Sequence, residues 1–203
     1  MPIKHKEVEG LIISVEKYGE NLQKISLCTS EDPSLLCFKR NSKQLNKNYS
    51  LDLFDSVQLI LDQPKSNSPY FVVDQKVTLH RQNIATSYQT FEYACKFNLF
   101  LMKNSHYIQE KPQLFDLAKK TLDSFNLSKK PTVTYIKAIY SIIHKEGLPI
   151  KESWLKNQPC SQKNPLEMLL KTPVDEVIID ENTLMSLSNS LSQWIKYDTD
   201  FIY

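Results

Sequence analysis

Residues 69–102 decide the fold, and they read PYFVVDQKVTLHRQNIATSYQTFEYACKFNLFLM. From Phe71 to Leu79, apolar residues alternate with polar ones apart from a skip near Asp74, which predicts a β-strand. After Arg81 the period becomes helical. Apolar side chains then recur every three or four residues, at Ile84, Tyr88, Phe91, Cys95, Leu99 and Met102. The change of period near residue 80 therefore separates a β-region from an α-region.

Upstream of this change, short apolar runs predict four more strands. They are Gly10–Val15, Leu22–Cys28, Leu35–Phe38 and the stretch 52–62. Turn residues separate them, as in Tyr18-Gly19 and Asp32-Pro33. Five short strands at close spacing are typical of a small barrel or sandwich.

Downstream, the pattern predicts a series of helices. Pro112 and Pro131 stand at first-turn positions, Gly147 is a helix stop, and Asp180 is a good N-cap before the last helix. Residues 148–165 read as irregular. Strands followed by helices indicate the α+β class, with a β-domain over residues 1–80 and an all-helical domain over residues 81–203.

Residues with catalytic or metal-binding potential are sparse. The chain has three glycines, too few for a phosphate-binding loop, and its four histidines are isolated. Cys28, Cys37, Cys95 and Cys160 form no C-x-x-C pair, so we expect reduced thiols and no zinc. The sequence shows neither a membrane span nor a secretory signal. We expect a cytoplasmic, non-enzymatic protein without cofactors.

A basic stretch, residues 38–49, is the clearest candidate site. It reads FKRNSKQLNKNY and holds Lys39, Arg40, Lys43 and Lys47 without an acid. We expect an exposed loop whose cations contact phosphate, with Lys17 and Tyr18 extending the patch on neighbouring strands. Phe38 and Tyr49 flank the loop and could stack on bases. The alternative is a solvated loop that aids solubility.

Charge is distributed unevenly along the helical half. Residues 81–171 carry fourteen Lys and Arg against seven acids, whereas residues 172–203 carry one Lys against six acids. The pair Lys119 and Lys120 is either a groove for an acidic partner or the wet side of an amphipathic helix.

Several short motifs, in this order, resemble RecO, the bacterial DNA-repair and recombination family. Residues 10–21, GLIISVEKYGEN, are similar to the opening strand and turn of that family, and the basic stretch after Leu35–Phe38 is similar to its basic loop. Leu51-Asp52-Leu53-Phe54, Pro112-Gln113-Leu114-Phe115 and the ending HKEGLP at 144–149 match in place. The four-cysteine zinc site of many relatives is missing, and the chain is shorter.

The resemblance implies an N-terminal OB-fold barrel that binds single- and double-stranded DNA and a helical C-terminal domain. It also implies strand annealing, RecA loading, and two protein partners, RecR and the acidic C-terminal tail of SSB. The alternatives are a protein-interaction module that has lost DNA binding and an OB-type RNA-binding protein.

Overall fold

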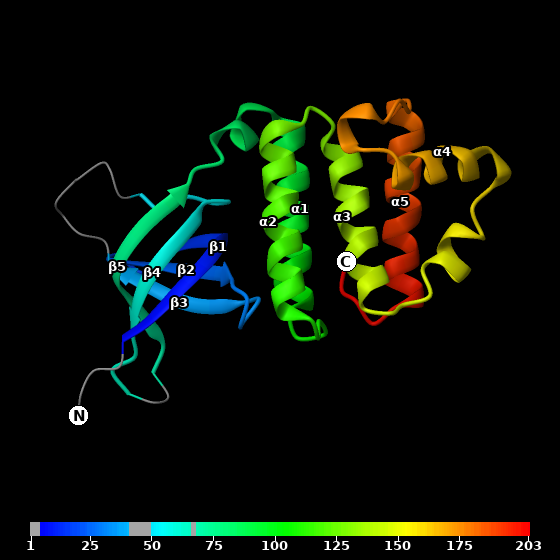
Figure 1. Ribbon diagram of the computed structural model, residues 1–203. Coiled ribbons are helices and arrows are strands. Elements are labelled where there is room, and N and C mark those ends of the chain that lie inside the picture. The colour runs from blue at the N-terminus through cyan, green and yellow to red at the C-terminus, as the bar shows by residue number, and fades with distance from the viewer. Residues whose placement is uncertain (1–4, 41–49, 66–67) are drawn as a thin grey trace. The chain divides into compact units, whose positions relative to one another are not determined.

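The computed structural model describes residues 5–40, 50–65 and 68–203. It contains two compact units (Figure 1). The sheet unit extends to Arg81 and includes Lys111–Asp116, and the helical unit consists of Gln82–Glu110 and Leu117–Tyr203. Five strands come first and helices follow, so the predicted α+β class is confirmed.

The sheet consists of β1 (His5–Tyr18), β2 (Leu22–Cys28), β3 (Leu35–Arg40), β4 (Ser56–Asp62) and β5 (Tyr70–Leu79). The strands pair in the order β1-β2-β3-β5-β4, and β4 pairs with β1 in turn, so the sheet closes on itself. β1 is long enough to pair with two strands: its first half pairs with β4 and its second half with β2. All pairs are antiparallel except β3 with β5.

The inner side of the sheet is apolar. Its core contains the buried side chains of Val8, Ile12, Ile25, Leu27, Leu35, Cys37, Leu51, Val57, Leu59 and Leu61. β1, β2, β3 and β4 all contribute buried side chains to this core. Their burial stabilises the unit, because the stabilisation grows with the apolar area removed from water.

A bulge in β5 corrects the predicted alternation of that strand. The register shifts between the pairs Ile60–Asp74 and Leu61–Val72, which leaves Val73 as the extra residue. Val72 therefore packs on the core, while Val73 is 58% exposed. The interruption of the alternation near Asp74 is therefore present in the structure. On its N-terminal side, the residue that faces the core is Val72 and not Val73.

The helices are α1 (Tyr88–Asn104), α2 (Lys111–Leu127), α3 (Pro131–Lys145), α4 (Cys160–Lys171) and α5 (Glu181–Asp198), with short turns η2 (Gln82–Thr86), η3 (Lys151–Leu155) and η4 (Val174–Glu176). α3 packs against both α1 and α5, and α4 lies beside α5 (Figure 1). The irregular stretch predicted over 148–165 is wrong at its end, because α4 runs through Pro165. Buried Leu166 and Leu169 hold that helix in place.

The predicted helix ends are confirmed. Pro112 and Pro131 lie in the first turns of α2 and α3, and Gly147 adopts a left-handed φ of 78° just after α3. Asp180 caps α5 by accepting a hydrogen bond from the Thr183 amide at 2.9 Å. Within the described ranges, no helix has the length and apolar character needed to cross a membrane.

The buried side of α1 is not the side that carries the apolar recurrence seen in the sequence. Ile84 is buried, but it belongs to η2 rather than to the helix. The remaining stripe turns outward: Tyr88 is 82% exposed and Leu99 49%. The buried side of α1 is formed by Thr90, Tyr93, Ala94, Phe97, Asn98, Phe100, Leu101 and Asn104. Because α1 is apolar on two sides, spacing alone could not identify the side that packs.

Candidate nucleic-acid interface

Strand register separates the predicted DNA-binding residues onto two sides of the sheet. Ile25 of β2 faces the core, and side chains alternate sides along a strand, so Gln23 shares its side. Lys17 and Lys39 both pair with Gln23 and therefore lie on that same side. Lys39 is half-buried, and burial lowers the pKa of its ammonium group. The structure therefore does not bring Lys17 and Lys39 onto one surface with Tyr18 and Arg40.

Tyr18 and Arg40 occupy the opposite, outer side of the sheet. Both pair with Leu22, which is out of phase with the core residues of β2. Phe38 is also outward, two residues before Arg40 in β3. The parallel pairing of β3 with β5 then places Phe71 directly beside Phe38. Three strands that are distant in sequence therefore contribute aromatic side chains to one surface.

We name Tyr18, Phe38 and Phe71 the outer aromatic patch. The ring centroids of Tyr18 and Phe38 are 5.1 Å apart in an edge-on arrangement, and those of Phe38 and Phe71 are 6.0 Å apart. Tyr18 is 55% exposed, and the two phenylalanines are half-buried. The exposed parts of these rings offer faces on which unpaired bases can stack, whatever their sequence.

Positive charge lies within the same patch. The guanidinium carbon of Arg40 is 5.8 Å from the centroid of the Phe71 ring, in cation–π range, and Arg40 is exposed. Lys24 pairs with Phe38 across β2 and β3, and its ammonium group forms a 3.2 Å ion pair with Glu16. A cation beside a stacking ring suits a nucleotide, because the base and its phosphate are recognised together.

The predicted loop is in part a strand. Lys39 and Arg40 belong to β3, which continues to Arg40 rather than ending at Phe38. Lys43 and Lys47 lie outside the described residues, as does Tyr49.

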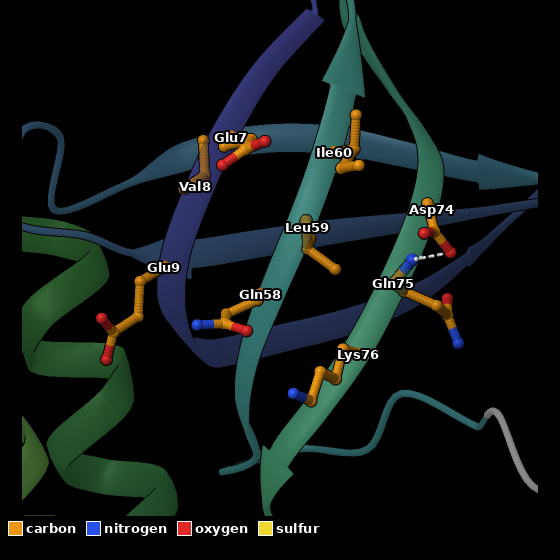
Figure 2. Close-up of a pocket in the computed structure, with 9 residues that line it drawn as sticks. All are labelled: Glu7, Val8, Glu9, Gln58, Leu59, Ile60, Asp74, Gln75 and Lys76. Carbon is orange, nitrogen blue, oxygen red and sulfur yellow. Dashed lines mark hydrogen bonds between the residues drawn. The ribbon is translucent and has the colours of Figure 1, made fainter.

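The outer side of β1, β4 and β5 has the opposite character. A groove of about 410 Å³ is lined there by Glu7, Val8, Glu9, Gln58, Leu59, Ile60, Asp74, Gln75 and Lys76. Figure 2 shows these side chains arriving from three neighbouring strands. Three carboxylates against one ammonium group repel phosphate, so this part of the outer surface does not suit nucleic acid, whereas the part around Tyr18, Phe38 and Phe71 does.

Some lysines of the helical unit are held by hydrogen bonds within the unit, and others are exposed to solvent. Lys119 is half-buried and Lys120 exposed on α2. Lys130 is structural, since its Nζ donates to the carbonyls of Asp175 and Val177 at 2.6 and 2.7 Å. A small apolar recess of about 80 Å³ lies elsewhere, lined by Lys96, Leu99, Phe100, Lys103, Tyr135 and Tyr203. Lys96 and Lys103 therefore line this recess, and Lys119 and Lys120 do not.

The cysteines and other potential metal ligands are dispersed. Cys28 and Cys37 are buried, Cys95 is half-buried and Cys160 is exposed, all as free thiols. In the part of the chain that the structure describes, no three His, Cys, Asp or Glu side chains come together in a group that could hold a metal ion.

Phe71 is the residue of the patch that sequence reasoning missed. It is 33 positions from Phe38 along the chain, and only the parallel β3–β5 register brings the two together. The sequence carries no signal that singles out Phe71, because a lone aromatic residue in a strand is compatible with either side of a sheet. No protein-family model matches the chain, and comparison with curated proteins finds no significant match.

Proposed function

We propose that this chain binds single-stranded DNA on the outer aromatic patch and acts as a recombination mediator of the RecO type. The observation that carries the binding part is the row of Tyr18, Phe38 and Phe71 with the Arg40 guanidinium group over the Phe71 ring. Stacking supplies sequence-independent affinity, and the cation supplies phosphate attraction.

The strand order supports an OB-fold assignment. A five-stranded closed sheet with the order β1-β2-β3-β5-β4 and a parallel β3–β5 pair is compatible with that fold. OB-folds bind oligonucleotides on the surface of strands 2 and 3 and on the adjoining loops. Phe38 and Arg40 lie on β3, and Lys24 lies on β2. The chemistry of the patch and the usual binding surface of the fold therefore coincide.

The patch favours single strands over duplex. Bases in a duplex are stacked on one another, so aromatic rings reach them only when the strand is unpaired. Duplex binding, annealing, RecA loading and the RecR partnership enter the proposal through the family resemblance.

Two substitutions test the proposal. Phe71→Ala removes one stacking surface and should weaken binding of a dT oligonucleotide by about 1–3 kcal/mol without changing the salt dependence. Arg40→Ala should weaken binding and reduce the slope of log K against log salt by about 0.7. Fluorescence anisotropy at several salt concentrations measures both effects.

The control is Lys76→Ala, which removes a cation from the acidic groove of the same sheet. Its affinity should match that of the wild-type chain. Equal affinity for all three variants, or an equal loss in Lys76→Ala, would refute the assignment of the patch. An RNA oligonucleotide of the same length, run in parallel, tests the RNA-binding alternative.

A second function, binding of an acidic peptide such as the SSB tail, is favoured by the recess on the helical unit. Leu99, Phe100 and Tyr135 offer apolar walls, and Lys96 and Lys103 stand at its edge. This arrangement suits an aromatic side chain next to a carboxylate. Lys103→Ala should weaken binding of a labelled acidic peptide, whereas Lys120→Ala should leave it unchanged. If Lys120→Ala weakened peptide binding and Lys103→Ala did not, the peptide site would lie on α2 instead.

A further inference from the structure

One side of α1 is an exposed apolar stripe formed by Tyr88, Phe91, Cys95, Leu99 and Met102. Tyr88, Phe91 and Leu99 are 82%, 40% and 49% exposed, and Cys95 and Met102 are half-buried. At 1.5 Å per residue the stripe is about 21 Å long. A helix that packs one side on its own core normally presents polar residues on the other. A continuous apolar row on the solvent side indicates an interaction surface.

The spacing of the stripe is symmetric about its centre. Tyr88 and Phe91 lie seven and four residues before Cys95, and Leu99 and Met102 lie four and seven residues after it. Intervals of three and four residues are those by which two helices interlock side by side. When two such helices run antiparallel, Cys95 meets its own copy, Phe91 meets Leu99 and Tyr88 meets Met102. The stripe is therefore complementary to itself, as a twofold interface requires.

The charges beside the stripe fit the same arrangement. Glu92 and Lys96 lie on one flank of α1, where their side chains form a 2.7 Å ion pair. A twofold axis through Cys95 keeps that flank on the same side in both copies. Each Glu92 then comes within about 3 Å, measured along the helix axis, of Lys96 of the second copy. Two Glu92–Lys96 contacts across the axis stand against one equally close Lys96–Lys96 contact, so opposite charges predominate beside the antiparallel register.

We propose that α1 pairs antiparallel with α1 of a second copy of this chain, about a twofold axis at Cys95. A contact made by one helix from each copy is at the small end of specific interfaces. The dimer is therefore in concentration-dependent exchange with the monomer. This inference concerns the helical unit and does not depend on DNA binding. Because Leu99 and Lys96 also line the recess, pairing of α1 and binding of a peptide there exclude each other.

Cross-linking through Cys95 tests the axis. In a Cys160→Ser background, which removes the exposed thiol, a short bis-maleimide should join two chains through Cys95. Added Cys95→Ser should abolish the cross-linked dimer, since Cys28 and Cys37 are buried. Sedimentation of the uncross-linked chain should show dimer increasing with concentration. A monomer at all concentrations up to several hundred micromolar, or equal cross-linking without Cys95, would overturn the proposal.

A charge exchange tests the register and does not depend on thiol chemistry. Glu92→Lys or Lys96→Glu alone should raise the dimer dissociation constant about tenfold, because each change sets like charges opposite each other at two symmetric places. The double variant Glu92→Lys with Lys96→Glu should recover the wild-type constant. Circular dichroism confirms that each variant is folded. Unchanged single variants, or a double variant as weak as the single ones, would overturn the antiparallel register.

Discussion

Replacing Asn104 with alanine should release residues 201–203 from the helical unit. Asn104 is fully buried, and its Nδ2 donates to the carbonyls of Phe100 and Ile202, each at 2.8 Å. Its Oδ1 accepts a hydrogen bond from the Ile202 amide at 2.7 Å. The same contacts keep the Phe201 ring stacked on Phe100, with centroids 5.6 Å apart. One side chain thus holds the backbone of the segment from both of its polar groups.

The expected cost follows from these contacts. Three hydrogen bonds contribute about 0.5–1.5 kcal/mol each, so their loss removes roughly 1.5–4.5 kcal/mol. Release of Phe201, which is only 8% exposed, adds up to about 2 kcal/mol of lost apolar burial. The Tm of the helical unit should therefore fall by about 5–15 °C. A thermal melt followed by circular dichroism measures this change, and hydrogen exchange should show loss of protection at the Ile202 amide.

The matched control is Lys103→Ala, at the neighbouring position. Lys103 is half-buried, and its Nζ reaches the Tyr203 carbonyl at a long 3.4 Å, so its removal should change the Tm by no more than about 2 °C. Asn104→Asp keeps the acceptor for the Ile202 amide but buries a carboxylate against the carbonyl oxygens of Phe100 and Ile202, so its Tm at pH 7 should be no higher than that of Asn104→Ala. The reasoning fails if Asn104→Ala melts like Lys103→Ala while the Ile202 amide stays protected.

Three further predictions concern local features. Asp180→Ala should lower the Tm at pH 7. Hydrogen bonds from Thr183 lower the pKa of the Asp180 carboxyl from 3.8, so the carboxylate stabilises the fold above pH 3.8 and loses this effect as the pH falls through the lowered pKa. Thermal melts of the wild-type chain and of Asp180→Ala should therefore converge at low pH. Gly147→Ala should cost about 1 kcal/mol in urea unfolding through backbone strain alone, since its φ is 78° and an added Cβ would meet no atom within 4 Å; a neutral result would contradict the left-handed turn. Burial raises the pKa of the Cys28 and Cys37 thiols to about 12, so in a native thiol titration Cys160 should react first and these two only after unfolding; early reaction of all three would show that the core is open.

The sequence by itself determined the order and type of most elements. Alternation over two residues and recurrence over three or four are local properties, and they predicted five strands followed by helices. Pro131, Gly147 and Asp180 marked helix ends correctly because each acts through its own backbone geometry or a partner three residues away. The basic stretch also drew attention to Arg40, which the structure places in the patch.

Only the tertiary structure decided which side chains meet. Phe71 joins Phe38 through a parallel strand pair, and Lys39 is separated from Arg40 because neighbours along a strand point to opposite sides. α1 is apolar on two sides, and its packing against α3 determined which side is buried. Each of these contacts depends on pairing between segments that are distant in the chain, and the register and packing of those segments determine which arrangement has the lowest free energy. A local period carries no information about that register.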